Sequence, residues 1–402
     1  MRTIDEHRAA ALALCAPGPV VAVPLAEARD LVLASDVRTD EPLPRWDCSA
    51  MDGFAVRARD LARASAERPV SLPLAGELPA GASASEMLEP GRCVAIMTGA
   101  PLPPGADAIV PVELVERTDR AVTFSASPRA GDHVRRAGED LEAGALVLEA
   151  GTVLGPTRLA ALATAGLGVV HVHRRPRVGV LATGDELVAP GTPLRRGQIP
   201  DSNSVLLAAA VEAAGCEVVR GGSVGDRPAE LQDRLAELEA AGCDVVVTSG
   251  GVSMGDFDVV KELLAGTGVE FVRVAMQPGK PQGLGRLPGG TSFFGLPGNP
   301  VSVFVSFEMF VRPALERLRG LVRPEREPVE LEVGHGWRTP AGRAQVMPVV
   351  IDLDGRVRPA SPRGSGSHLA ASLARANGLA FVPVEVEEVA PGDRVRVMRV
   401  DR

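Results

Sequence analysis

Residues 244–258 read DVVVTSGGVSMGDFD, an apolar run followed by two glycines and two acidic residues. The run over Asp244–Thr248 is typical of a strand that helices cover on both faces. Extended and helical patterns alternate on either side of it. The expected strands and helices, in chain order, are Val178–Ala182, Ser204–Ala214, Glu217–Arg220, Pro228–Ala241, Phe257–Leu264, Phe271–Ala275, Gln282–Leu287, Ser292–Phe294 and Val301–Leu318. This alternation predicts a doubly wound α/β domain at residues 176–322.

The rest of the chain divides into smaller parts. Residues 47–137 are rich in Pro and Gly and carry short apolar runs, which predicts an inserted β domain. Residues 1–46 and 138–175 favour helices, those of the first segment around a short extended piece, and predict a helical domain split by that insertion. Residues 329–402 alternate β runs with Gly turns, and predict a C-terminal β domain with one helix near Leu369–Ala376.

The composition excludes several classes of protein. The chain has 402 residues and a net charge of −8, which argues against nucleic-acid and membrane-surface binding because both need a basic face. Its five cysteines form no CxxC pair, so we expect a reducing cytoplasm. Asp5 and Glu6 occupy the start, where a signal peptide would be basic. The apolar stretch Thr291–Phe310 is broken by Gly, Pro and Glu, so we expect no membrane span.

Glycine-bearing loops follow three of the predicted strands, where an open α/β sheet binds its ligands. Gly250 and Gly251 let backbone N–H groups approach a phosphate without a Cβ in the way. Asn299 is suited to cap the last helix and Pro300 to its first turn, which presents free amides to an anion. One such loop alone is commonly only a turn; three together indicate a ligand site.

Acidic residues and lysines accompany these loops. The acids after the first and third strands are Asp185, Glu186, Asp256 and Asp258. Carboxylates are hard ligands that hold Mg²⁺ between protein and phosphate. Of 43 basic residues only Lys261 and Lys280 are lysines, and both belong to this region. The residues alone therefore predict a Mg²⁺-assisted site for a phosphorylated or nucleotidyl ligand.

With its loops in this order, the sequence resembles the molybdopterin molybdenumtransferase family, known as MoeA in bacteria and as the gephyrin E domain in animals. The resemblance covers nearly the whole chain, in seven motifs that follow the family's order. The motifs are Asp47–Ala55, Met97–Pro101, Arg135–Asp140, Ala182–Leu187, Ser249–Asp258, Gly279–Pro281 and Leu296–Ser302.

The resemblance implies a four-part fold and a homodimer in the cytoplasm. It implies an active site between the α/β and C-terminal domains of one subunit and the inserted region of the other. The catalytic residues that match the family are Asp47, Thr98, Asp140, Glu186, Asp258 and Lys280, and the metal ligands are Glu186, Asp226 and Asp258. The substrate-binding candidates are Ser249, Gly250, Gly251, Pro297, Asn299, Pro300, Ser302, Arg343 and Ser365.

The implied reaction is a Mg²⁺-dependent insertion of molybdate into adenylyl-molybdopterin, with release of AMP. Magnesium on the acidic loops would stabilise the pyrophosphate-like bridge. Cationic and hydroxyl groups would hold the oxyanion, and Lys280, Ser302, Arg343 and Ser365 are the candidates. The protein's contribution is mainly positioning and charge neutralisation.

Four positions depart from the family's pattern. Cys48 replaces an Asn, Gln277 a basic residue, Gln345 an acid and Pro348 an arginine. Two positive groups are thereby lost from the expected molybdate pocket. Two alternatives therefore remain open: a binding or scaffold protein with an unidentified protein partner, and a sibling enzyme that inserts tungstate.

Overall fold

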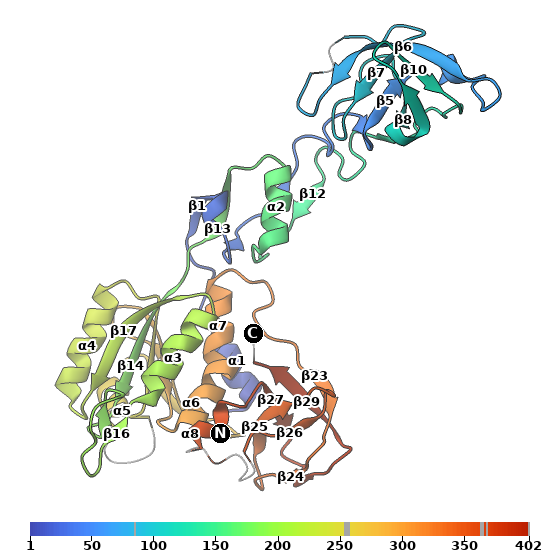
Figure 1. Cartoon of the computed structure of the whole chain (residues 1–402). Coiled ribbons are helices and arrows are strands. Elements are labelled where there is room, and N and C mark those ends of the chain that lie inside the picture. Colours follow the sequence, from blue (N-terminus) through green and yellow to red (C-terminus); the bar gives the residue numbers. More distant parts are fainter. Residues whose placement is uncertain (84–85, 253–257, 362–365, 367–368, 401–402) are drawn as a thin grey trace. The chain divides into compact units, whose positions relative to one another are not determined.

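The computed structural model describes residues 1–83, 86–252, 258–361, 366 and 369–400. The chain forms two compact units (Figure 1). The larger unit contains Met1–Ser35, Ala150–Gly155 and Val169–Arg402, and the smaller unit contains Asp36–Glu149 and Pro156–Gly168.

A six-stranded sheet forms the centre of the larger unit. Its order is β17 (Glu217–Val224), β14 (Arg177–Thr183), β18 (Val245–Ser249), β22 (Ser292–Leu296), β21 (Pro281–Arg286) and β19 (Val269–Arg273). The first four strands are parallel, and β21 is antiparallel to both of its neighbours. The carboxyl ends of β14, β18 and β22 therefore meet at one edge of the sheet.

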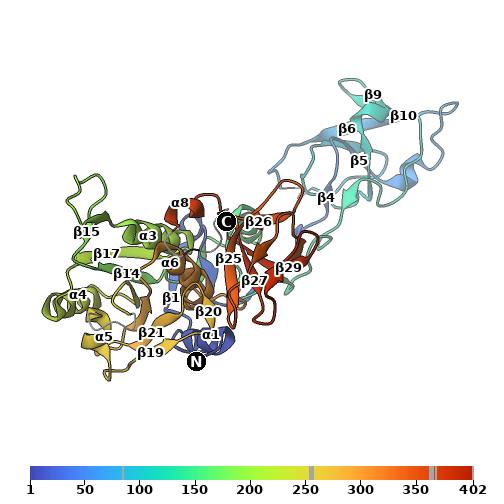
Figure 2. The same cartoon turned by 90° about the horizontal axis from the view of Figure 1, so that it is seen from below.

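Helices cover both faces of this sheet, as the apolar strands predict (Figure 2). On one face, α3 (Ser202–Ala213) packs Leu207 and Val211 against Val178 and Val180 of β14. On the other face, α4 (Pro228–Ala240) and α5 (Val259–Leu264) pack in a second cluster that contains Val246 of β18. The strand residues alternate between the two clusters because successive side chains of a strand point to opposite faces. The doubly wound α/β arrangement is thus confirmed.

The long helix predicted over Val301–Leu318 is interrupted. It consists of α6 (Pro300–Ser306), a π-helical turn η4 (Phe307–Val311) and α7 (Arg312–Leu318). Arg312 Nε and Nη2 donate to both carboxylate oxygens of buried Glu308 at 2.8 and 2.9 Å. The N-terminal helix α1 (Ile4–Ala13) packs on this turn, where the His7 ring meets Phe310 edge-on at 4.6 Å between centroids.

The C-terminal segment forms a second sheet in the same unit. Its order is β20 (Met276–Gln277), β25 (Ala344–Ile351), β27 (Gly378–Val382), β29 (Arg394–Arg399) and β23 (Val329–Glu332), with β26 (Val357–Pro359) beside β25. The segment also contains a separate antiparallel pair, β24 (Trp337–Arg338) with β28 (Glu388–Val389), and a short helix, α8 (Ala370–Leu373). Because β20 belongs to the α/β segment, its parallel pairing with β25 fixes one sheet against the other.

The first 45 residues are less helical than expected. Only α1 is an α-helix there, and the rest is extended or forms a 3₁₀ turn, η1 (Leu25–Glu27). β1 (Val20–Pro24) and β2 (Val32–Leu33) pair with opposite edges of β13 (Val169–His173). The prediction of several helices was wrong because Val20, Val21 and Val23 are β-branched residues that fit a paired strand.

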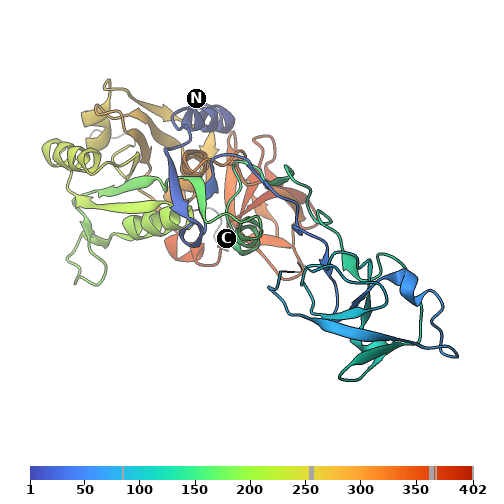
Figure 3. The same cartoon turned by 90° about the horizontal axis from the view of Figure 1, so that it is seen from above.

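The smaller unit is built mainly of strands (Figure 3). Its six-stranded sheet has the order β8 (Ala108–Pro111), β5 (Gly53–Val56), β7 (Cys93–Ile96), β6 (Val70–Leu78), β10 (Ala121–Phe124) and β9 (Val115–Arg117). Two strand pairs lie outside it, β3 (Val37–Arg38) with β12 (Leu146–Leu148) and β4 (Cys48–Ser49) with β11 (Val134–Arg135). Its helix α2 (Pro156–Thr164) begins at Pro156, a residue suited to the first turn of a helix. The core contains Phe54 and Phe124, whose rings meet edge-on.

Within the described residues, no helix is long and apolar enough to cross a bilayer. The boundaries of the four predicted domains stay a prediction.

Candidate functional site

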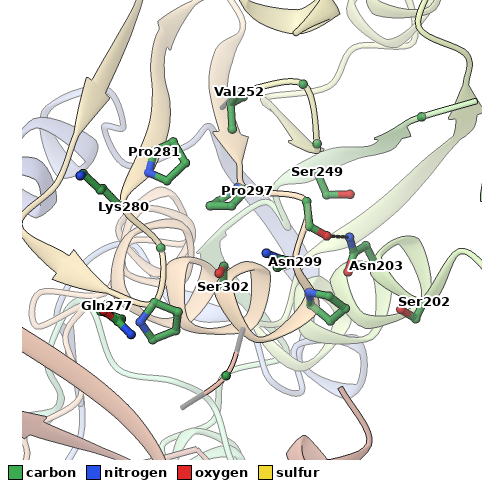
Figure 4. Close-up of a pocket in the computed structure, with 18 of the residues that line it drawn as sticks. Ser202, Asn203, Ser249, Val252, Gln277, Lys280, Pro281, Pro297, Asn299 and Ser302 are labelled. Carbon is green, nitrogen blue, oxygen red and sulfur yellow. Dashed lines mark hydrogen bonds between the residues drawn. The ribbon is translucent and has the colours of Figure 1, made fainter. Parts of the chain in front are cut away.

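A cavity of about 1050 Å³ opens in the larger unit at the carboxyl ends of β14, β18 and β22. Figure 4 shows Ser249 and Asn203 on one side of it and Lys280, Pro281 and Gln277 on the other. Pro297, Asn299 and Ser302 lie between them. We call the first side the α/β wall, and define it by the loops after β14, β17, β18 and β22 with the start of α3. The second side, the basic wall, is defined by residues 276–281 and 338–345.

The loop after β18 can be formed only by glycine at its first position. Gly250 has a φ of +95°, and a Cβ there would lie 2.7 Å from the carbonyl oxygen of Thr183. The loops after β18 and β22 adjoin, because the Gly250 N–H donates to the Leu296 carbonyl oxygen at 3.0 Å. A Cβ added to Gly298 would lie 3.6 Å from the Gly250 Cα. The glycines thus bring three strand ends into one compact edge, with backbone open to a ligand.

Two helices begin at this cavity. Asp201 caps α3 by accepting a hydrogen bond from the Ser204 N–H at 2.9 Å. Asn299 holds the N-cap position of α6, and Pro300 its first turn, as the sequence predicted. Ser302 is 4% exposed and lines the cavity. Helix starts present free amides and a positive dipole end, so this edge favours an anionic ligand.

The acidic residues of the α/β wall lie on three loops. Glu186, Asp226 and Asp258 all line the cavity. Asp185 ties two of these loops together, since Asp226 N donates to Asp185 Oδ1 at 3.2 Å and Asp185 N approaches Asp226 Oδ2 at 3.4 Å. No three of the acidic, His or Cys residues in the described part of the chain converge as a ready metal cluster. Asp256 lies outside the described residues.

The basic wall carries three cations, Lys280, Arg338 and Arg343. Two of them were expected from the sequence, and Arg338 was missed. Arg338 belongs to no motif; it lies on β24, which pairs with β28 in a separate two-stranded sheet beside the cavity. Lys261, the other lysine of the chain, is a half-buried residue of α5 that is not among the residues lining the cavity.

Buried hydrogen bonds hold the backbone of Lys280 in place. Gln282 Nε2 donates to the Gly279 carbonyl oxygen and to Ser306 Oγ, each at 2.7 Å. The Lys280 carbonyl oxygen accepts from Val274 N at 2.7 Å. Gln282 and Ser306 are at most 1% exposed, so these bonds are shielded from water. The lysine loop is thereby tied to α6, the helix whose first residues line the same cavity.

Two of the four departures from the family's pattern occupy paired positions. Gln277 and Gln345 are register partners on β20 and β25, and both line the cavity. Against the family pattern expected from the sequence, two amides stand at the positions of a basic and an acidic residue, so the net charge expected for the pair is the same. Gln345 is buried, and its Oε1 accepts from Trp337 Nε1 at 2.9 Å. Pro348 lies outside this cavity, buried on β25.

Most predicted site residues of the larger unit line this one cavity. They are Glu186, Asp226, Ser249, Gly250, Gly251, Asp258, Lys280, Pro297, Asn299, Pro300, Ser302 and Arg343. Ser365 lies outside the described residues. Arg338 and Asn203 also line the cavity and were not predicted from the sequence.

The remaining predicted residues belong to the smaller unit. Asp47 accepts from Ala137 N at 2.9 Å and from Arg136 Nη1 at 2.6 Å, and these bonds lower the pKa of its carboxyl. Thr98 donates through its N–H and its hydroxyl to Asp52 Oδ1 at 2.7 and 2.8 Å. Arg136 and Asp52 were not identified as partners from the sequence.

Two more residues complete this part of the smaller unit. The Asp140 N–H donates to the Leu43 carbonyl oxygen at 2.9 Å, which anchors its backbone. Cys48 is buried, and burial raises the pKa of its thiol, so it is not a thiolate nucleophile at neutral pH.

Comparison with known proteins covers almost the whole chain. A family model described as the MoeA N-terminal region (domain I and II) matches residues 2–166. One described as a probable molybdopterin binding domain matches residues 179–317, and one described as the MoeA C-terminal region (domain IV) matches residues 330–400.

Several relatives and solved structures are similar over their full length. Molybdopterin molybdenumtransferase 2 of Mycobacterium tuberculosis is 43% identical over 99% of both chains. Molybdopterin molybdenumtransferase of Nostoc sp. is 37% identical over 94% of this chain and 88% of its own. A crystal structure of a molybdopterin biosynthesis MoeA protein from Pyrococcus horikoshii has a TM-score of 0.83 at 28% identity, over 100% of both chains.

Proposed function

We propose, since this chain belongs to the molybdopterin molybdenumtransferase family, that it inserts molybdate into adenylyl-molybdopterin and releases AMP. The three family models and the full-length relatives confirm the resemblance that the seven motifs indicate. The proposed substrates are inferred from the family. How they are bound is inferred from the residues of this chain that line the cavity.

One observation carries the proposal: a single cavity has carboxylates on one wall and cations on the other. The α/β wall presents Glu186, Asp226 and Asp258, and the basic wall presents Lys280 and Arg343, with Arg338 beside them. A nucleotide ester bound through a divalent cation and a free oxyanion need these two opposite environments. The cavity, at about 1050 Å³, is at the upper end of the range for small-molecule sites, which suits a substrate with both a pterin and a nucleotide.

The acidic residues fit Mg²⁺ when substrate phosphate completes its coordination. Mg²⁺ in phosphate sites takes only one or two carboxylates from the protein and the rest from phosphate and water. Glu186, Asp226 and Asp258 line the cavity without forming a closed cluster, which suits such an open site. When bound, Mg²⁺ would neutralise the phosphate bridge that is cleaved to release AMP.

Lys280, Arg343 and Ser302 are the groups that we infer to bind molybdate. A point charge, a planar guanidinium and a hydroxyl are complementary to a tetrahedral oxyanion. Arg338 joins this set because it lines the same wall. The backbone beside Lys280 is held by the bonds of Gln282 to Gly279 and Ser306, so the loop needs little reorganisation when charge develops.

The chain's part in the reaction is positioning. The α/β wall orients the phosphate bridge, and the basic wall holds molybdate toward the dithiolene sulfurs. Water adds to a phosphorus atom of the bridge as its P–O bond breaks, which gives AMP and the phosphate of molybdopterin. The cations of the basic wall offset the negative charge that accumulates when two anions occupy one cavity.

The homodimer is a further part of the proposal. We infer that Asp47, Thr98 and Asp140 act on substrate bound by a second copy of the chain. Mixing Asp140→Ala protein with Asp258→Ala protein should then restore part of the activity that each lacks, because one of the two sites in a mixed dimer is intact. Activity no higher than that of the separate variants would refute a shared site.

The cytoplasm is the proposed location. All five cysteines are free and buried, which agrees with a reducing compartment. The scaffold alternative has no specific support in the cavity, because the Gln277–Gln345 exchange preserves the charge of that pair. The tungstate alternative differs only in the oxyanion, and competition between the two oxyanions distinguishes it.

The direct test is release of AMP by the purified protein. Adenylyl-molybdopterin, molybdate and Mg²⁺ are supplied together, and each of the last two is omitted in turn. We expect AMP release that requires both. Release that ignores molybdate would contradict the proposed transfer, and no release under any condition would contradict the activity itself.

A further inference from the structure

Two polar atoms of the α/β wall are buried without a hydrogen-bond partner. Asn203 is 8% exposed and Ser249 is 1% exposed, and both line the cavity. Within the part of the chain that the structure describes, neither Asn203 Oδ1 nor Ser249 Oγ has a partner. Buried polar atoms in folded proteins nearly always have a hydrogen-bond partner. Two buried atoms without one in the same cavity therefore indicate that a bound ligand supplies the missing partners.

The orientation of the Asn203 amide is determined by its one bond. Asn203 Nδ2 donates to the Gly298 carbonyl oxygen at 2.7 Å (Figure 4). A carbonyl oxygen only accepts, so the group that faces it must be the NH₂ and not the oxygen. Oδ1 therefore lies on the other side of the amide and needs a donor. A phosphate or molybdate oxygen cannot provide one unless it is protonated.

The two atoms belong to adjoining segments. Ser249 directly precedes Gly250, whose N–H donates to the Leu296 carbonyl oxygen at 3.0 Å. Asn203 is bonded to Gly298, two residues after Leu296. Oδ1 of Asn203 accepts only, whereas the Ser249 hydroxyl both donates and accepts. Together they can serve a ligand edge that carries a donor next to an acceptor.

We propose that Asn203 and Ser249 form a subsite for the polar edge of a heterocycle, an exocyclic amino group beside a ring nitrogen. The amino group donates to Asn203 Oδ1, and the ring nitrogen accepts from Ser249 Oγ. This rests on the proposed function, whose substrate carries two such edges, one on the pterin and one on the adenine. The subsite positions the organic part of the substrate, away from the cations that hold the oxyanion.

The chain offers matched controls one residue away. Thr248 Oγ1 and Ser204 Oγ are also buried without a partner in the described part of the chain, but neither residue lines the cavity. Ser249→Ala and Thr248→Val each remove one unpaired hydroxyl from the same strand. Only the first removes it from the cavity.

The experiment is a calorimetric titration of the full-length protein with AMP and, separately, with pterin-6-carboxylate, both in the presence of Mg²⁺. We expect Ser249→Ala to weaken the binding of one probe by about 5- to 10-fold, the usual effect of losing one buried hydrogen bond. Thr248→Val should change neither affinity by more than about twofold. Loss confined to AMP assigns the subsite to the adenine, and loss confined to pterin-6-carboxylate assigns it to the pterin.

A second pair isolates the acceptor on Asn203. Asn203→Leu and Asn203→Asp both lose the bond to Gly298, but only the aspartate keeps an oxygen that accepts. Asn203→Asp should therefore bind the affected probe more tightly than Asn203→Leu, and Ser204→Ala should bind it like the wild type.

Equal affinities in both matched pairs, for both probes, would overturn the subsite. That result leaves molybdate-dependent AMP release by the wild type untouched. Conversely, the absence of AMP release by the wild-type protein would refute the proposed function. The affinities of the matched variants for the two probes would still test the subsite.

Discussion

The two walls of the cavity are built on different principles. The α/β wall is an edge of glycine loops and acids, of which Glu186 and Asp226 are exposed and Asp258 is half-buried. Asn203 Oδ1 and Ser249 Oγ have no hydrogen-bond partner there within the described part of the chain. The basic wall is stabilised by buried hydrogen bonds. Gln282 donates to Gly279 and Ser306, and Trp337 donates to Gln345. The first wall leaves hydrogen-bonding and metal-binding positions for a ligand and a metal ion. The second wall has a backbone that buried hydrogen bonds hold in place near its cations. This difference suggests which mutations reduce binding and which reduce turnover.

The largest expected effect comes from the basic wall. Lys280→Ala should lower kcat by about 10²- to 10³-fold, comparable to the loss of a preorganised charge at an oxyanion. Lys261→Ala is the matched control, since Lys261 does not line the cavity, and it should stay near wild type. Steady-state AMP release with molybdate titrated provides the measurement. An equal loss of kcat in the two variants would mean that Lys280 has no specific role in binding the oxyanion.

The next effect comes from the α/β wall. Asp258→Ala should keep the fold and lower kcat/KM by about 10²-fold, with part of the loss recovered at higher Mg²⁺ because a weakened metal site is refilled by mass action. Asp233→Ala, on an exposed position of α4, serves as the control. A magnesium dependence identical to that of the wild type would argue that Asp258 does not help to bind the ion.

A smaller effect concerns the paired glutamines of the basic wall, Gln277 and Gln345. Gln345→Glu alone places a carboxylate at a position 2% exposed, and should destabilise the protein by about 1 to 3 kcal/mol. Adding Gln277→Arg on the neighbouring strand should recover at least about 1 kcal/mol of this, because the two positions are register partners. Urea unfolding of the two single variants and the double variant gives the coupling energy. Strict additivity would show that the two exchanges are independent.

A last effect lies outside both walls. Burial lowers the pKa of His7 to about 4, from an ordinary value near 6.5. The unfolded chain therefore binds the proton more readily, so stability is full above pH 6.5, falls as the pH drops toward 4, and then levels off. The contribution is on the order of 3 kcal/mol at most. His7→Leu should flatten this part of the stability profile measured by urea unfolding, whereas His171→Gln, on an exposed position, should leave it unchanged.

Much of the α/β wall could be predicted from sequence, and the reason is geometric. The carboxyl ends of parallel strands meet at one edge, so glycines and acids that follow β14, β18 and β22 must lie near one another. Apolar runs such as Val245–Val247 identify those strands without further information.

The basic wall was harder to predict, because tertiary contacts build it. Arg338 reaches the cavity through strand pairing in another sheet, and the roles of Gln282 and Ser306 depend on side chains 24 residues apart. The π turn at Phe307–Val311 was also missed, since its residues fit a helical pattern equally well. More than one helix was wrongly expected in residues 1–45, where Val20–Pro24 and Val32–Leu33 instead pair with β13.

We propose that one cavity keeps the oxyanion and the nucleotide on opposite walls. A crystal of the protein soaked with molybdate, AMP and Mg²⁺ provides the decisive measurement, because anomalous scattering locates molybdenum without ambiguity. We expect a molybdenum peak beside Lys280 and Arg343, and the AMP phosphate beside the acidic loops. Molybdenum bound away from the basic wall, with AMP absent from the α/β wall, would contradict it.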